Sequence, residues 1–116
     1  MTVVLIGRDL LFGSRIADAA ARADREFLRV DDPAGLPSPA SVQLVLVHWA
    51  ERLPDWGVRL QTWRADAPES ARPRLLLFGP HTDLAAHADA RSAGLGPMWA
   101  RSKLVTELPT LVATVG

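Results

Sequence analysis

The stretch VQLVLVHW, residues 42–49, decides how this chain folds. Apart from Gln43, its first six residues are valines and leucines. A short run that is apolar on both faces is typical of a strand in a parallel sheet covered by helices on both sides. The run ends at His48, whose imidazole can titrate or bind a metal ion. The stretch therefore predicts a buried strand that brings a histidine to the edge of a sheet.

Two other runs have the same character, TVVLI at 2–6 and RLLLF at 74–78, and EFLRV at 26–30 and PMWA at 97–100 are weaker strand candidates. Segments with helical spacing lie between them, which predicts right-handed βαβ crossovers and a mainly parallel, doubly wound sheet of five strands. The segment 31–41 contains three prolines and a glycine. The second crossover helix is therefore expected to be short or missing.

The last helix is the clearest and is predicted over 103–115. Its apolar residues recur at the spacing that covers a sheet, and Pro109 is expected to kink it because proline lacks a backbone N–H. The stripe consists of Leu104, Leu108, Leu111, Val112 and Val115.

Length and composition limit the possible functions. The 116 residues fit one domain, 1–116, and 13 basic residues balance 13 acidic ones, so no net field would attract nucleic acid or an anionic membrane. The absence of cysteine excludes disulfides and thiolate catalysis. No apolar stretch approaches the roughly 20 residues of a membrane helix. We expect a cytoplasmic protein that binds neither nucleic acid nor membrane.

The order of elements resembles the receiver domain of bacterial two-component response regulators, over nearly the whole chain. VVLIGRDLLFGSRIADAA is similar to a receiver's first strand, acidic turn and first helix, and VQLVLVHWAERLPDWGVRLQTWR to its third strand and helix. ARSAGLGPMWARSK looks like the turn and short fifth strand that deliver the receiver's lysine. The resemblance implies a flavodoxin-like (CheY-like) fold of three αβα layers, with sheet order 2-1-3-4-5.

A receiver needs an acidic pair for magnesium, an aspartate that accepts phosphoryl, a hydroxyl and a lysine, and this chain departs from each requirement. Aligning the strands predicts a degenerate site of Gly7 and Arg8 at the acidic pair with Asp9 one place late, His48 at the acceptor, Phe78 or Gly79 at the hydroxyl, and Arg101 at the lysine. One displaced carboxylate beside an arginine is a poor magnesium site. We therefore expect a pseudo-receiver that has lost phosphorylation, is not an enzyme and uses no cofactor.

A second class of function uses the same edge of the sheet. Asp9, His48 and His81 follow three different strands, and the carboxyl ends of parallel strands form the ligand crevice. Two imidazoles and a carboxylate can bind a transition metal, so a small-ligand or metal-binding flavodoxin-like protein is the alternative. In the plainest interpretation, His48 only packs beside Trp49 and donates one hydrogen bond.

The resemblance also implies an interaction face. In receivers, the fourth helix, fifth strand and fifth helix form the usual dimer and output surface, and a partly buried tryptophan is a typical anchor for a protein partner. We expect this face to bind a protein partner or a second copy of the chain in bacterial signalling or regulation. Its predicted residues are Ala85, Ala88, Asp89, Trp99, Arg101, Lys103 and Glu107.

Overall fold

The computed structural model describes residues 1–114 and contains one sheet of five parallel strands in the order β2-β1-β3-β4-β5. The sheet order and class agree with the flavodoxin-like fold predicted from the sequence. The strands are β1 (Thr2–Ile6), β2 (Glu26–Val30), β3 (Val42–His48), β4 (Arg74–Gly79) and β5 (Trp99–Ala100). The helices are α1 (Leu10–Arg22), α2 (Trp56–Ala65), α3 (Leu84–Ser92) and α4 (Arg101–Thr114).

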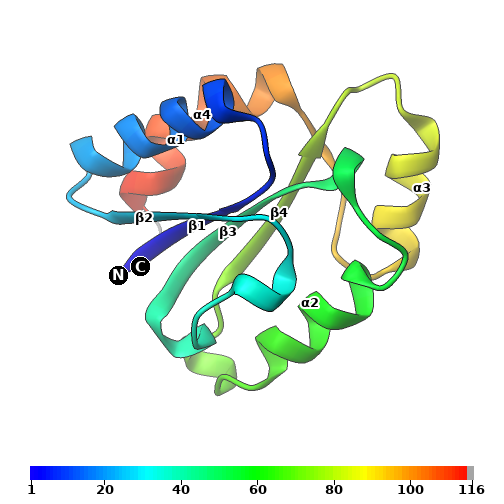
Figure 1. Ribbon diagram of the computed structural model, residues 1–116, viewed down its shortest axis with the longest axis horizontal. Helices are drawn as coiled ribbons and strands as arrows, with labels where there is room; N and C mark the ends of the chain where they lie inside the picture. The colour runs from blue at the N-terminus through cyan, green and yellow to red at the C-terminus, as the bar shows by residue number, and fades with distance from the viewer. Residues whose placement is uncertain (115–116) are drawn as a thin grey trace.

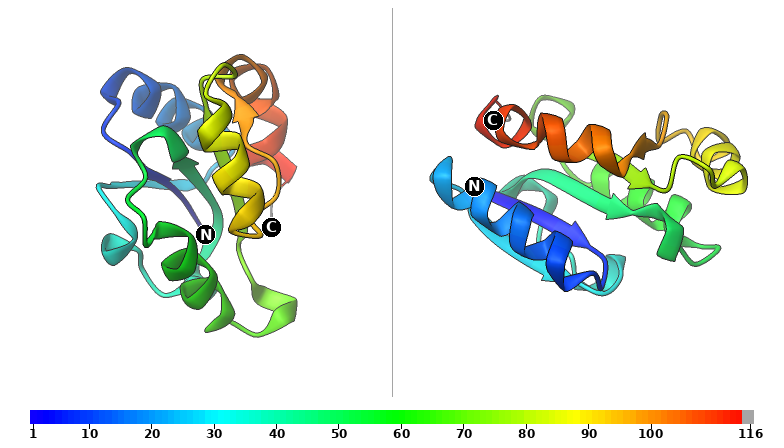
Figure 2. Two further views of the ribbon diagram at one scale, coloured as in Figure 1. Left: turned by 90° about the vertical axis from the view of Figure 1, so that its right-hand side faces the viewer. Right: turned by 90° about the horizontal axis from the view of Figure 1, so that it is seen from above.

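The helices form two layers around the sheet. Helices α1 and α4 lie side by side on one face, and α2 and α3 cover the other (Figure 1, Figure 2). Residues of β3 alternate between the layers, because successive side chains of a strand point to opposite faces. Leu44 and Leu46 pack with the α1 and α4 cluster, whereas Val45 and Val47 pack with the α2 and α3 cluster. His48 therefore belongs to the α1 and α4 side.

The second crossover contains no α-helix, as the prolines predict. Two short 3-10 turns, η1 (Pro33–Gly35) and η2 (Pro39–Ser41), connect β2 to β3. Each turn begins with a proline, whose fixed φ suits the first helical position and whose missing N–H is not needed there. Other 3-10 turns follow β3, at η3 (Trp49–Glu51), and α2, at η4 (Glu69–Ala71).

The end of the chain differs in detail from the prediction. Strand β5 contains two residues instead of the four expected at 97–100, because Gly96 has a left-handed φ of 79° and Pro97 has no N–H to donate to β4. Helix α4 begins at Arg101 and continues through Pro109 to Thr114, while the predicted stripe residue Val115 lies outside the described residues. Over residues 1–114, no helix is long and apolar enough to cross a membrane.

Candidate functional site

His48 ends the central strand and lies inside the protein rather than on an open rim. Its side chain is 7% exposed. The imidazole stacks on Phe78 at the end of the neighbouring strand, with ring centroids 5.1 Å apart and planes 3° from parallel. Phe78 stacks in turn on Phe12 of α1 at 4.9 Å. The aromatic stack shields one face of the imidazole from solvent. Whether His48 can bind a metal ion or transfer a proton is therefore decided by its ring nitrogens.

Both ring nitrogens of His48 have protein partners. The Arg101 Nη2 lies 2.7 Å from Nε2, and the Glu51 Oε2 lies in close hydrogen-bonding contact with Nδ1. A guanidinium has only donors, so Nε2 must accept the hydrogen bond with its lone pair. The proton of the neutral ring is then on Nδ1 and is donated to the Glu51 carboxylate. This arrangement fixes the tautomer and leaves no lone pair for a metal ion or a substrate proton.

The same cluster ties together three loops at the carboxyl edge of the sheet. Glu51 Oε2 also accepts the backbone N–H of Arg8 at 3.2 Å, which links the loop after β1 to the turn after β3. Arg101 connects both to the start of α4. We call His48, Glu51, Arg101 and the Arg8 backbone the His48 cluster. It joins the loops that follow β1, β3 and β5 through polar contacts.

Gly7 makes this cluster sterically possible. A Cβ atom added to Gly7 would lie 2.9 Å from the His48 Cβ and 3.3 Å from the Glu51 Oε2. Real Cβ atoms essentially never approach other atoms to 2.9 Å. An acidic side chain at position 7 and the present arrangement of His48 and Glu51 are therefore mutually exclusive without movement of the backbone.

Asp9 serves as the N-cap of α1. Its Oδ1 accepts the backbone N–H of Phe12 at 3.0 Å, which satisfies one of the free amide groups at the start of the helix. The loop before Asp9 is in contact with a cation, because Arg29 donates a hydrogen bond to the carbonyl oxygen of Gly7 at 3.0 Å. The carboxylate of Asp9, which the sequence placed next to the position of a receiver's acidic pair, is therefore used to cap α1.

Phe78 and Gly79, which the sequence predicted at the hydroxyl position of a receiver, have no hydroxyl group. Phe78 pairs in register with His48 and fills the aromatic stack. Gly79 is packed under Met98, whose sulfur would lie 3.0 Å from a Cβ added to the glycine. Both positions are thus used for packing.

The metal-binding alternative finds no support in the geometry. Among residues 1–114, no group of three histidine, cysteine or acidic side chains is placed to hold a metal ion. His48 and Asp9 are already engaged, and His81 is exposed in the turn before α3, where its carbonyl oxygen accepts from the His87 ring at 3.2 Å. Asp9, His48 and His81 are therefore not brought together as that hypothesis requires.

The residues of the predicted interaction face differ in exposure and in their contacts. Trp99 is half-buried, and the ammonium of Lys103 lies 4.3 Å from the centre of its ring. Ala85, Ala88 and Glu107 are exposed. Arg101 is directed to His48. The two tryptophans at strand ends differ in burial. Trp49 is only 2% exposed and its indole N–H donates to the Ala86 carbonyl at 3.0 Å, whereas Trp99 reaches the surface.

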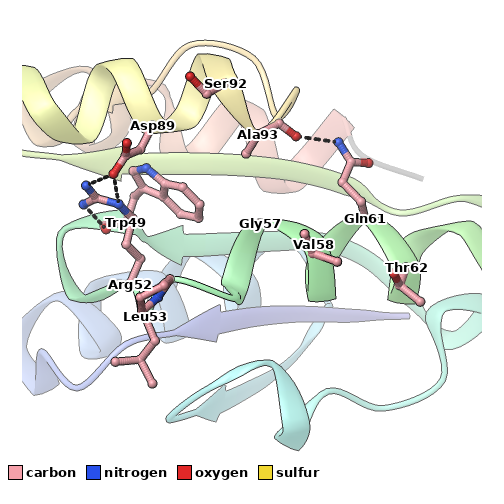
Figure 3. A pocket seen from close by; sticks show the side chains of 11 residues that line it. Trp49, Arg52, Leu53, Gly57, Val58, Gln61, Thr62, Asp89, Ser92 and Ala93 are labelled. Atoms are coloured by element: carbon pink, nitrogen blue, oxygen red, sulfur yellow. Dashed lines mark hydrogen bonds and ion pairs between the residues drawn. The ribbon is translucent and has the colours of Figure 1, made fainter.

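Asp89 differs from the other residues of the predicted face in its contacts. Its carboxylate forms an ion pair with Arg52, whose Nε lies 3.0 Å from Oδ2, so it belongs to the α2 side of α3 rather than to the β5 side. It lines a groove of about 800 Å³ between α2 and α3, together with Leu53, Val58 and Ala93 (Figure 3). At the opposite end of this groove, Gln61 donates to the carbonyl oxygen of Ala93 at 3.1 Å.

The fold and the cluster define a flavodoxin-like αβα domain with an internal histidine network at the carboxyl edge of its sheet. No family model matches the chain, and no curated protein matches it. Among solved structures, the chain is similar to the response regulator receiver domain from Rhodospirillum rubrum, with 17% sequence identity and a TM-score of 0.61. The similarity covers 97% of this chain and 92% of that chain, and it supports the shared fold.

Proposed function

We propose that this chain is a receiver-like signalling module that is not phosphorylated and acts by binding a protein. The observation that carries the proposal is the His48 cluster. Phosphoryl transfer to a receiver needs a carboxylate acceptor and a divalent cation that neutralises the developing charge. The side chain at the end of β3 is an imidazole with both nitrogens engaged, and Asp9 caps α1.

Arg101 supports this proposal in a second way. In the receiver pattern, the basic residue after the fifth strand pairs with the phosphoryl group, and here its guanidinium donates to His48 at 2.7 Å. The cluster thus already contains the cation-to-acceptor contact between the ends of β3 and β5. We infer that the module has one resting arrangement and does not wait for a phosphoryl group to form that contact.

The test combines phosphodonor and metal with a direct readout. The chain is incubated with acetyl phosphate and Mg²⁺, or with beryllofluoride and Mg²⁺, and followed by intact-mass spectrometry and amide NMR. We expect no added phosphoryl group and no shift at residues 7–9, 48–51 or 101. A mass increase of one phosphoryl group that requires Mg²⁺ would overturn the proposal, and the same incubation without Mg²⁺ is the matched control.

The proposed contact surface is the α3, β5 and α4 face around Trp99. Trp99 is half-buried, the ammonium of Lys103 lies 4.3 Å from the centre of its ring, and hot spots of protein interfaces are enriched in tryptophan. We propose that this face binds a second copy of the chain or a protein partner. Sedimentation over a range of concentrations tests the first case. Trp99→Ala should weaken self-association, whereas Val58→Ala, an exposed change on α2, should leave it unchanged.

A further inference from the structure

Strand β2 is an open edge of the sheet, at the opposite margin from β5 and Trp99. Within residues 1–114 it pairs with β1 alone, and Figure 2 shows it along the outer margin of the sheet. The crossover that follows it consists of two 3-10 turns and contains no α-helix. An edge strand presents unpaired backbone N–H and C=O groups, which can pair with another strand. This edge is therefore a candidate interaction surface.

The hydrogen bonds at the two ends of β2 show which of its backbone groups face outward. Glu26 donates its backbone N–H to the Met1 carbonyl at 3.2 Å, and Gly7 donates to the Val30 carbonyl at 3.0 Å. The backbone groups of a strand point alternately to its two sides, so every second residue from Glu26 to Val30 bonds to β1. The backbone groups that face away from β1 belong to the residues in between, namely Phe27 and Arg29.

The centre of this edge is apolar. Leu28 is the middle residue of β2 and is 38% exposed. Its side chain lies on the α2 side of the sheet, because Val30, two residues further, packs with the α2 and α3 cluster. Protected edges often contain a proline, a lysine or a bulge. Strand β2 contains neither of these residues and pairs with β1 without a shift of register, so it lacks these common barriers to pairing with a further strand.

We propose that β2 pairs in antiparallel orientation with β2 of a second copy of the chain. A two-fold axis relates the copies, and the pairing joins their two sheets into one continuous sheet. The axis places one residue opposite its own copy, and hydrogen bonds form only where outward-facing residues lie opposite each other. The outward-facing residues of β2 meet in three registers, centred on Phe27, Leu28 or Arg29. This inference goes beyond the proposed function and uses the other edge of the sheet.

The charges at the edge favour the register centred on Leu28. In this register, Arg25 lies opposite the partner's Asp31 on both sides of the axis, one residue beyond each end of the strand. The register centred on Phe27 instead places Arg25 opposite the partner's Arg29. The register centred on Arg29 places two copies of that arginine opposite each other. Opposite charges across paired strands are stabilising and like charges are destabilising, so only the first register is complementary.

Asp31 can accept the contact with the partner's Arg25. Its side chain is 62% exposed, and its contacts with Arg29 at 2.8 Å and with Arg8 at 4.0 Å both use Oδ1. The hydrogen bond from Arg29 holds the pKa of the Asp31 carboxyl below its usual value, so the group is charged near neutral pH. Its second oxygen, Oδ2, is therefore the acceptor for the partner's guanidinium.

A single cysteine reads out the register, because the natural chain contains none. The two Leu28 Cα atoms would form a non-hydrogen-bonded pair about 4.5 Å apart, which a disulfide can span. We expect Leu28→Cys to give a covalent dimer under mild oxidation, seen on a non-reducing gel. Glu26→Cys is the matched control, because Glu26 is exposed on the same face and lies opposite the partner's Val30. Its two copies would be about 14 Å apart, so it should cross-link at least about tenfold more slowly.

Sedimentation equilibrium measures the dimer without a cross-link. Two paired strands of five residues bury less area than a standard interface, so we expect a weak dimer whose population rises with concentration. Leu28→Lys places two ammonium groups at the axis and should raise the dissociation constant about tenfold. Val58→Lys adds the same charge at an exposed site on α2 and should leave it unchanged. Thermal unfolding by circular dichroism checks that each variant is folded, and the cysteine pair decides the result if Leu28→Lys is not.

The outcomes separate this inference from the proposed function. We expect Leu28→Lys to weaken the dimer and Trp99→Ala to leave it intact, so that both Trp99 faces remain free for a protein partner. A dimer that responds only to Trp99→Ala would overturn the β2 interface and support the Trp99 face. A chain that stays monomeric up to about 1 mM, or equal cross-linking of the two cysteine variants, would overturn the inference as well.

Discussion

At the scale of single residues, His48 shows how a polar side chain is kept inside a sheet of valines and leucines. Burying an imidazole is unfavourable unless its nitrogens are paired, and here an arginine and a glutamate supply both partners. The stack on Phe78 adds apolar contact to the ring. The histidine is thus held by three independent contacts. We therefore expect its removal to lower the stability of the whole domain.

Removing this side chain gives the first prediction. His48→Ala deletes the aromatic stacking and leaves Glu51 and Arg101 without their shared partner. We expect the free energy of unfolding to fall by about 2–4 kcal/mol, which is the range for breaking a buried hydrogen-bonded network. Urea unfolding measures it. His81→Ala is the matched control, because His81 is exposed and should change stability by less than about 0.5 kcal/mol. Equal effects of the two substitutions would show that His48 carries no such network.

The second prediction concerns Gly7, where the Cβ atom of any other residue would contact His48. An alanine there would lie 2.9 Å from the His48 Cβ, so we expect Gly7→Ala to destabilise the fold by about 1–3 kcal/mol. Gly13 of α1 is the control, because its added Cβ meets Leu5 at an ordinary 3.6 Å and alanine favours helix. Gly13→Ala should stabilise by about 0.5–1 kcal/mol.

A double-mutant cycle checks the cause assigned to Gly7. In the His48→Gly background the clashing Cβ is absent, so Gly7→Ala should lose much of its effect on the free energy of unfolding. An unchanged effect in that background would mean that strain elsewhere in the loop, and not contact with His48, makes glycine necessary at this position.

The sequence indicated some members of the His48 cluster and not others. The apolar run 42–47 was enough to place His48 at the end of a strand, and alignment of the strands brought Arg101 to the same edge. Glu51 was not predicted. It can contact His48, three residues earlier, only because the chain turns into η3 directly after β3. The contact thus depends on a 3-10 turn that has no clear sequence signal.

At the scale of elements, the packing of α2 against α3 depends on one glycine. A Cβ on Gly57 would lie 2.9 Å from the Cβ of Ala93, which follows α3 directly (Figure 3). The close approach allows Gln61, one turn further along α2, to donate to the Ala93 carbonyl. This contact closes one end of the groove between the helices.

The third prediction follows from this contact. Helix propensity alone predicts that Gly57→Ala stabilises α2 by about 0.5–1 kcal/mol. The overlap with Ala93 should outweigh it, so we expect a net destabilisation of about 1–2 kcal/mol in thermal or urea unfolding. Ala93→Gly in the same chain should restore most of the loss by removing the second Cβ. A stabilised Gly57→Ala variant would show that the helices separate at little cost.

Elements differed in how well the sequence predicted them. Strands β1 and β3 were predicted within one residue, because a run buried on both faces must be apolar throughout. Strand β5 was predicted too long, since PMWA contains only two residues that pair with β4. Met98 is buried yet unpaired, which shows that burial and strand pairing are separate conditions. The start of β5 depends on hydrogen bonds to the neighbouring strand β4, which a single sequence does not reveal.

At the scale of the whole molecule, stability should fall from the centre of the sheet to its edges. Every residue of β3 is buried, and the strand pairs with β1 on one side and β4 on the other. Strand β2 pairs only with β1, contains only exposed and half-buried residues, and leads into a crossover without an α-helix. Few buried contacts and an open edge are the features of segments that unfold locally.

The fourth prediction is the resulting order of amide hydrogen exchange. Hydrogen-bonded amides of Val45 and Val47 should exchange only when the whole domain unfolds, so their opening free energy should equal the free energy of unfolding measured with urea. Hydrogen-bonded amides of Leu28 and Val30 should open at a lower free energy and respond less to denaturant. Because the His48 cluster joins the loops after β1, β3 and β5, His48→Ala should lower the opening free energy of β3 and leave that of β2 nearly unchanged. Equal protection in β2 and β3 would contradict this order and would mean that the helix-free crossover holds the edge strand as firmly as the core.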